Sequence, residues 1–247
     1  MMNAALAAVG LSGRYRLLPT PAEALAARLA EVRAEFAGVN VTVPHKRRIL
    51  PLLDELDPVA AAIGAANTIV NREGRLVGHN TDADGFYWAL EREGLCSGEA
   101  LVLGAGGAAR AVVHALVKRG WLVGVYNRTL ARAQSLVEEV GGWLVVPQKL
   151  EKAVRRTPLL VNATSVGLDD PQASPLPPGV LPESGGVVDL VYRPLETRLL
   201  REARAAGLAT QDGLSMLLGQ GVRAFELWTG RPAPVAVMER ALREGGS

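Results

Sequence analysis

The chain has 247 residues, of which 49% are hydrophobic, and its formal net charge is +2. Such a chain can bury the core of one large or two modest globular domains. No apolar stretch reaches the roughly 18 residues that span a bilayer and no signal segment opens the chain, so we expect a cytoplasmic protein. The even charge gives no reason to expect nucleic acid as a partner, and a single cysteine excludes a disulfide framework or a multi-cysteine metal site.

The first predicted element is a helix from Pro21 to Phe36, which Gly38 ends. A capping box of Thr20 and Glu23 is expected at its start. The helix is followed by a predicted strand, 39–43, in which valines alternate with polar residues, so that one face is buried and the other is polar. One apolar stripe of the helix is predicted to face the core: Leu25, Leu29, Val32 and Phe36.

A lysine directly after this strand is a candidate functional residue. The 27 basic residues comprise 23 arginines and only four lysines, and Lys46 is one of the four. Unlike arginine, a lysine can lose its proton when it is removed from water. A functional Lys46 and a lysine kept by chance remain open alternatives on this argument alone.

A predicted hairpin of strands 68–71 and 76–79 leads to a second candidate, Asp82, which immediately precedes a predicted helix from Asp84 to Glu93. Asp82 can cap that helix through its carboxylate. A catalytic role is compatible with capping, because a carboxylate fixed at a helix start is a preorganised acid-base or hydrogen-bonding group.

The stretch 101–110 predicts a dinucleotide site. A hydrophobic strand, 101–103, turns through glycines into an Ala- and Val-rich helix, and the next strand is expected at 121–126. Glycine at 104 permits the tight turn, Gly106 and Gly107 leave room for phosphate, and the first amides of the helix point at the anion. The alternative is an ordinary turn rich in small residues.

The residues after the second strand favour NADP over NAD. An NAD site places Asp or Glu there to bind the ribose hydroxyls, whereas this chain has Asn127, Arg128 and Thr129, with Arg132 one helical turn further on. Guanidinium groups bind a 2′-phosphate through charge-assisted hydrogen bonds, and Thr129 is expected to cap the helix. The alternative is a pair of solvated arginines on a surface helix.

The remaining pattern alternates strand and helix, with strands expected near 143–146, 158–161, 186–190 and 208–210. We therefore predict an α/β fold with two domains, a Rossmann-like doubly wound domain for NADP and an α/β substrate domain that the C-terminal helices complete. The domains are assigned to residues 1–82, 83–212 and, for the returning helices, 213–247. The three histidines are too dispersed for a metal site, so no metal is predicted.

Several motifs together resemble the shikimate dehydrogenases, which reduce 3-dehydroshikimate with NADPH in the pathway to chorismate and the aromatic amino acids. The resemblance runs nearly from end to end. It rests on Asn40–Lys46, Gly64–Thr68, Asn80–Asp82, Gly104–Ala108, Asn127–Arg132, Asn162–Gly167, Asp189–Pro194, Gly213 and Gln220.

The resemblance implies a role for each of these positions. Lys46 and Asp82 would be the catalytic pair, with Lys46 exchanging the proton of the reacting hydroxyl and Asp82 binding the adjacent hydroxyl. The other substrate-binding residues would be Thr42, Asn67, Tyr192 and Gln220. NADP would be bound by Gly104, Ala105, Gly106, Gly107, Ala108, Asn127, Arg128, Thr129, Arg132 and Thr164, and Leu190 and Gly213 would flank the nicotinamide.

One departure from the family pattern matters. Family members begin with a strand and a Ser-x-Ser loop that binds the substrate carboxylate, whereas this chain opens at Met1–Leu6, in the helix expected after that loop. The interpretations are a truncated chain or a variant without this anchor, and either exposes a sheet edge in the substrate domain. The alternatives to an NADP-dependent shikimate dehydrogenase are a quinate/shikimate dehydrogenase using NAD and a catalytically impaired NADP-binding homologue. The sequence leaves a monomer and a homodimer open.

Overall fold

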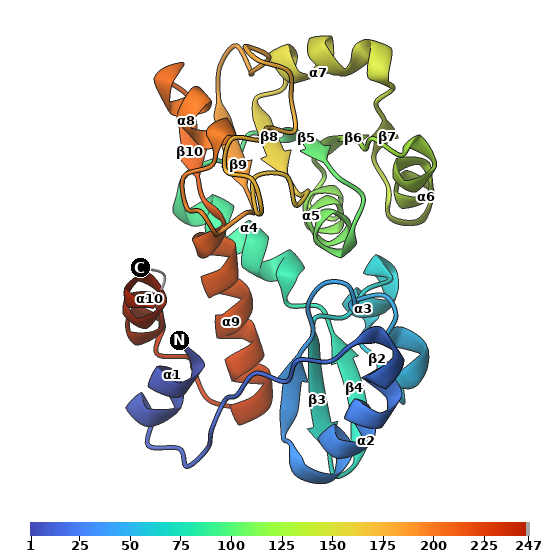
Figure 1. The fold of residues 1–247 in the computed structure, drawn as a ribbon, viewed down its shortest axis with the longest axis vertical. Coiled ribbons are helices and arrows are strands. Elements are labelled where there is room, and N and C mark those ends of the chain that lie inside the picture. The colour runs from blue at the N-terminus through green and yellow to red at the C-terminus, as the bar shows by residue number, and fades with distance from the viewer. Residues whose placement is uncertain (246–247) are drawn as a thin grey trace. The chain divides into compact units, whose positions relative to one another are not determined.

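The protein is described from a computed structural model that covers residues 1–245. Its chain divides into two compact units, which are described separately. Unit 1 holds Met1–Gly85 and the chain from Leu218 onward, and unit 2 holds Phe86–Leu217 (Figure 1). Both boundaries fall inside helices, α4 (Asp82–Arg92) and α9 (Gly213–Thr229). Within residues 1–245, none of the helices combines the length and the apolar character required to cross a membrane.

Unit 1 is built on a four-stranded sheet in the order β1-β3-β4-β2. The predicted hairpin is confirmed: β3 (Thr68–Arg72) and β4 (Arg75–His79) pair antiparallel. β1 (Gly38–Asn40) pairs antiparallel with β3 and lies at the edge of the sheet, whereas β2 (Glu55–Leu56) runs parallel to β4 and was not predicted. A strand of two residues is too short to show the alternation of buried and exposed side chains by which a strand is predicted.

One helix covers a face of this sheet (Figure 1). The helix α2 (Leu25–Glu35) follows a 3-10 turn, η1 (Ala22–Ala24), and buries the predicted stripe, with Phe36 partly buried. The expected capping box is wrong, because the Thr20 hydroxyl donates to the Leu18 carbonyl instead. A 3-10 turn, η2 (Leu50–Leu52), lies between β1 and β2. Short helices α1 (Met2–Ala8), α3 (Pro58–Ile63) and α10 (Val235–Glu244) complete unit 1.

Unit 2 has a six-stranded, fully parallel sheet in the order β10-β9-β8-β5-β6-β7. Helices α5 and α6 cover one face and α7 and α8 the other, which confirms the predicted doubly wound α/β fold (Figure 1). The strands are β5 (Glu99–Leu103), β6 (Leu122–Tyr126), β7 (Trp143–Leu144), β8 (Leu159–Asn162), β9 (Gly186–Asp189) and β10 (Ala209–Gln211), and the helices are α5 (Gly107–Val117), α6 (Leu130–Val140), the 3-10 turn η3 (Pro147–Lys149), α7 (Leu150–Arg156) and α8 (Arg198–Ala205).

Candidate functional site

The predicted catalytic pair lies together in unit 1. Lys46 Nζ donates to Asp82 Oδ2 at 2.6 Å, and the two side chains are 15% and 5% exposed. Asn67 Nδ2 donates to the other carboxylate oxygen, Asp82 Oδ1, at 2.9 Å. Both oxygens of Asp82 thus accept a hydrogen bond. An ammonium carries three N–H groups, and within residues 1–245 the Lys46 ammonium donates one of them. The Lys46–Asp82 cluster, defined as Lys46, Asn67, Thr81, Asp82 and Gln220, has donor capacity left over for a ligand.

The start of helix α4 frees the Asp82 carboxylate for these contacts. The predicted capping role of Asp82 is wrong, because the side chain of Asn80 fills it: Asn80 Oδ1 accepts the N–H groups of Asp82 and Ala83 at 3.1 and 3.3 Å. Asn80 Nδ2 in turn donates to the Ala65 carbonyl at 2.9 Å. The helix start is thereby satisfied and tied to the neighbouring loop without using the Asp82 carboxylate.

Asn67 is held in one orientation by its neighbours. Its Oδ1 accepts the Thr81 N–H at 2.7 Å, which leaves Nδ2 directed at Asp82 and at the Thr81 hydroxyl, 3.0 Å away. The Lys46 backbone is anchored beside it, since the Ala66 N–H donates to the Lys46 carbonyl at 2.9 Å. The Lys46–Asp82 cluster is therefore assembled from the segment after β1, the loop before β3 and the segment that joins β4 to α4, with Gln220 added from α9. Sequence reasoning missed Thr81, although it stands next to Asp82.

Gln220 reaches the cluster through a close helix crossing. Gly85 of α4 and Gly219 of α9 pack backbone against backbone: a Cβ on Gly85 would stand 2.3 Å from the Gln220 nitrogen, and one on Gly219 would stand 2.6 Å from the Gly85 carbonyl oxygen. The absence of both side chains lets the Gln220 side chain approach Asn67, with 3.5 Å between Gln220 Oε1 and Asn67 Nδ2.

Thr42, the other predicted substrate residue of unit 1, has an exposed side chain and takes no part in the hydrogen bonds of the cluster. It lines a hollow of about 460 Å³ beside the edge strand β1, between the segments 14–20 and 38–45. Tyr15 lines the same hollow and donates its hydroxyl to Asn40 Oδ1 at 3.0 Å, and burial raises the pKa of this phenol. Tyr15 was not predicted, because its segment has neither helical nor strand periodicity.

The predicted pyrophosphate turn lies at the carboxyl end of β5 in unit 2. Gly104 has φ +118°, a conformation that L side chains rarely adopt, and a Cβ there would stand 2.8 Å from the Ala163 carbonyl oxygen. Gly106 is the N-cap of α5 and is exposed, with open space where its Cβ would be. Ala105, Gly107 and Ala108 lie around the same helix start, at intermediate exposure. The turn thus offers free helix amides and no side chain to obstruct an anion.

The two arginines predicted to recognise a 2′-phosphate flank the start of α6. Both are exposed, and among the residues the structure describes neither side chain has an ion-pair or hydrogen-bond partner. Thr129 is the N-cap residue as predicted, but its side chain forms no capping bond; the Asn127 amide donates to the Thr129 carbonyl at 2.9 Å. Arg128 and Arg132 are therefore available for an external anion.

A buried network joins the loops that follow β8 and β9. Asp189 Oδ1 accepts from Asn162 Nδ2 and from the Val191 N–H at 2.9 and 3.0 Å, and Oδ2 accepts from the Thr197 hydroxyl at 2.7 Å. Asn162 Oδ1 accepts the Thr164 hydroxyl at 2.7 Å, which places Thr164 beside the Gly104 turn. Burial raises the pKa of Asp189 to about 6. The sequence motifs located these loops, but the network itself was not predicted.

Three further predicted residues also lie in unit 2. Leu190 and Gly213 meet, since a Cβ on Gly213 would stand 2.5 Å from the Leu190 carbonyl oxygen and the Gly213 N–H donates to the Val191 carbonyl at 3.3 Å. Tyr192 lies in the loop after β9 with its side chain exposed. The structure therefore gathers Leu190 and Gly213 at one place and leaves Tyr192 open to a ligand.

Three segments of the chain match models of known protein families. Residues 1–69 match the family model described as the shikimate dehydrogenase substrate binding domain, residues 89–167 match shikimate / quinate 5-dehydrogenase, and residues 213–243 match the shikimate 5′-dehydrogenase C-terminal domain.

Individual relatives agree with these models. Shikimate dehydrogenase (NADP(+)) of Thermus thermophilus is 56% identical over 97% of this chain and 90% of the relative. The crystal structure of shikimate 5-dehydrogenase from the same species, in complex with NADP(H) and shikimate, has a TM-score of 0.93 at 52% identity, over 98% of this chain and 92% of that one. Quinate dehydrogenase from Corynebacterium glutamicum, in complex with NAD, has a TM-score of 0.85 at 32% identity, over 98% and 91%. The predicted resemblance is confirmed: this chain belongs to the shikimate dehydrogenase family.

Proposed function

We propose that this protein is an NADP-dependent shikimate dehydrogenase, which reversibly reduces 3-dehydroshikimate to shikimate in the biosynthesis of chorismate and the aromatic amino acids. The family membership supports this function. The single structural observation that carries it is the bonded set Lys46, Asp82 and Asn67, which offers a proton donor and two hydrogen-bonding groups at one place.

Lys46 is the proposed proton donor. Reduction of a ring ketone produces an alkoxide, which needs a proton from a group within hydrogen-bond reach. The Lys46 ammonium has N–H groups beyond the one that Asp82 accepts, so a ketone oxygen can bind there while the ion pair persists. In the reverse direction, neutral Lys46 accepts the proton of the reacting hydroxyl.

Asp82 is proposed to bind the neighbouring substrate hydroxyl and to keep Lys46 in place. Its Oδ2 and Oδ1 each have lone pairs beyond those that Lys46 and Asn67 occupy, so the carboxylate can accept one more hydrogen bond. Asn67 and Gln220 would bind further hydroxyls, and Thr42 and Tyr192 would position the rest of the substrate. Such positioning makes the reaction effectively intramolecular.

The residues of unit 2 fit NADP. The nicotinamide supplies or accepts the hydride when it is bound. The Gly104–Ala108 turn would take the pyrophosphate, because its backbone approaches Ala163 too closely for a side chain and opens at Gly106. Arg128 and Arg132, with Asn127 and Thr129, would bind the 2′-phosphate. Thr164, Leu190 and Gly213 are proposed to line the remainder of the site.

The first experiment is the initial rate of NADP reduction with shikimate, compared with NAD and with quinate as the alternative cofactor and substrate. Reduction of NADP by shikimate, faster than any other pairing, supports the proposal. A preference for NAD with quinate would instead identify a quinate/shikimate dehydrogenase. NADP binding without any turnover would identify the catalytically impaired homologue.

We also propose that the enzyme acts in the cytoplasm, without membrane attachment, and we keep the homodimer as a hypothesis that sedimentation equilibrium tests directly. The assignment of residues 83–212 to NADP stays a prediction. Hydrogen exchange measured with and without NADP tests it, since the new protection is expected inside that range.

A further inference from the structure

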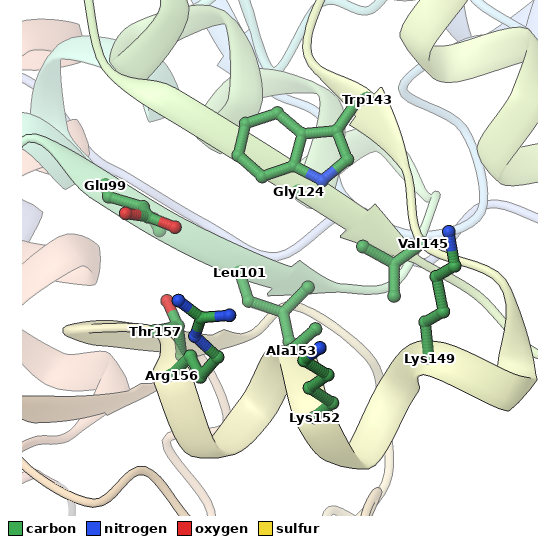
Figure 2. A pocket seen from close by; sticks show the side chains of 11 residues that line it. Glu99, Leu101, Gly124, Trp143, Val145, Lys149, Lys152, Ala153, Arg156 and Thr157 are labelled. Carbon is green, nitrogen blue, oxygen red and sulfur yellow. The ribbon is translucent and has the colours of Figure 1, made fainter.

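A second hollow, of about 500 Å³, lies within unit 2 between the sheet and helix α7 (Figure 2). Its floor is apolar and includes Leu101 and Val145, which belong to the buried core under α7. The first three residues of β5, Glu99 to Leu101, line it, whereas the Gly104 turn follows the last residue of that strand. The hollow is therefore separate from the proposed cofactor turn.

A glycine in the middle of β6, Gly124, lets three of the side chains that line the hollow lie close to this strand. A Cβ on Gly124 would come within 3.1 Å of Val145 and 3.3 Å of both Leu101 and Trp143, so a larger residue would push these side chains apart. The Trp143 side chain borders the hollow and is left 43% exposed. An aromatic surface next to an apolar floor suits a flat ring.

Three cations face the same hollow from the helix side. Lys149 is the N-cap of α7, and Lys152 and Arg156 follow it at i+3 and i+7, a spacing that places the three on one side of this segment. Figure 2 shows the two lysines extending from this segment toward the strands. None of the three has an ion-pair or hydrogen-bond partner among the residues the structure describes. The neighbouring Arg155, by contrast, is bonded to Glu151 at 2.8 Å.

Glu99 is the one acidic residue in the described lining of the hollow. Three cations therefore face a single carboxylate, and the local formal charge is positive. Unpaired cations around an apolar floor disfavour an uncharged occupant and favour an anion whose charge offsets theirs. A hollow of this volume falls within the range of small-molecule sites.

We propose that this hollow is a binding site for a small aromatic dicarboxylate. The ring lies against Trp143 above the Gly124 floor, and the carboxylates bind Lys149, Lys152 and Arg156. This site does not depend on the proposed dehydrogenase activity, because none of its residues is assigned to substrate or to NADP.

Isothermal titration calorimetry with benzene-1,3-dicarboxylate tests the proposal on the full chain, with and without saturating NADP. We expect saturable binding to one site in both cases, weakening as salt is added. The uncharged benzene-1,3-dicarboxamide should bind at least about tenfold more weakly, because it lacks the charges. Cyclohexane-1,3-dicarboxylate should bind about three- to tenfold more weakly, because it lacks the aromatic face.

Variants assign the binding to this hollow. Lys149→Gln, Lys152→Gln and Arg156→Gln should each weaken the affinity about two- to fivefold, as expected for exposed charge pairs, and the triple variant by more than about tenfold. Trp143→Leu should weaken it about threefold or more, and Glu99→Gln should strengthen it by removing a like charge. The matched control is Arg155→Gln, whose guanidinium belongs to the Glu151 pair and should leave the affinity unchanged.

Several outcomes would overturn the proposal. It fails when the dicarboxylate gives no saturable heat, when the dicarboxamide binds equally well, or when Arg155→Gln weakens binding as much as Lys152→Gln does. It also fails when saturating NADP abolishes the signal, since the probe would then occupy the cofactor site. The single variants keep the test decisive even where circular dichroism shows that the triple variant does not fold.

Discussion

Two buried carboxylates stand at comparable places in the two units and are held in different ways. Asp82 lies two residues after the Asn80 that follows β4, is buried, and forms an ion pair with Lys46. Asp189 is the last residue of β9, is fully buried, and has no cationic partner among the described residues; an amide, a backbone N–H and a hydroxyl donate to it.

The difference distinguishes the arrangement that we propose to be catalytic from one that holds loops in place. The Lys46–Asp82 pair combines a proton donor with an acceptor and keeps unused hydrogen-bonding capacity toward a ligand. The donors around Asp189 come from the last residue of β8, the loop after β9 and the N-cap of α8, so that carboxylate holds these segments together and is sealed from solvent. Burial alone therefore does not identify a carboxylate of the proposed active site; its hydrogen-bond and ion-pair partners do.

The largest expected effect on turnover comes from removing Lys46, the ion-pair partner of Asp82. Lys46→Ala should lower the turnover number for shikimate oxidation by about 10²- to 10⁴-fold, the range for loss of a general acid-base group. The affinity for NADP should stay within about twofold, because Lys46 belongs to unit 1 and the proposed cofactor residues to unit 2. Steady-state kinetics and a fluorescence titration with NADPH measure the two quantities.

Lys118→Ala is the matched control, since Lys118 is an exposed lysine at the end of α5. Its turnover should equal that of the unaltered chain. If folded Lys46→Ala turns over at the original rate, Lys46 has no role in the mechanism. Asp82 and Asp189 would then differ only in how they are packed.

Asp189 should make the free energy of unfolding depend on pH. The pKa of Asp189 is about 6 in the folded chain and about 4 in an unfolded one, so the folded state binds this proton more tightly. The resulting stabilisation is fully present below pH 4 and is lost as the pH rises through 6. Relative to Asp189→Asn, the free energy of unfolding should therefore fall by about 2 kcal/mol between pH 4 and pH 7, measured by urea unfolding.

Other titratable groups do not affect this comparison, because the original chain and Asp189→Asn both carry them. Thr197→Ser, which keeps a hydroxyl donor to Asp189, is the control and should leave the pH dependence unchanged. A constant gap between Asp189→Asn and the original chain from pH 4 to pH 7 would show that this carboxylate titrates normally despite its burial.

The unpaired cations of unit 2 give a third contrast with the paired Lys46. Arg128→Ala should weaken the affinity for NADP about tenfold or more, the value of one charge-assisted hydrogen bond, and should change the affinity for NAD by less than about twofold. Arg119→Ala, which removes an arginine stacked over Tyr87 rather than one at the start of α6, serves as the control. Equal weakening for NADP and NAD would refute the assignment of Arg128 to the 2′-phosphate.

The sequence predicted those parts of the fold that repeat a local pattern. The alternation of strand and helix in unit 2, the hairpin β3–β4 and the glycine turn at 104 each depend on neighbouring residues, and each is confirmed. The two-residue strand β2 was missed, because two residues are too few to show an alternating pattern.

Within the site, motifs located the residues but not their bonds. Lys46 and Asp82 were predicted as a pair. That Asn80 caps the start of α4 while the Asp82 carboxylate binds Lys46 was not predicted. The contact of Gln220 with Asn67 joins residues 153 positions apart and depends on a crossing of two glycines. Long-range packing of this kind leaves no periodicity in the sequence from which to predict it.

The smallest expected effect tests whether Asn80, and not Asp82, satisfies the start of α4. Asn80→Ala removes the acceptor for two N–H groups and should lower the free energy of unfolding by about 1–2 kcal/mol, the usual cost of a lost helix cap. Asn80→Ser restores a capping oxygen but not the bond to the Ala65 carbonyl, so it should recover only part of that loss. Asn80→Ala should also slow turnover a few-fold, because an uncapped helix start lets the Asp82 carboxylate turn toward the helix amides. If the original chain, Asn80→Ala and Asn80→Ser are equally stable, Asp82 caps the helix after all, and its contact with Lys46 does not depend on Asn80.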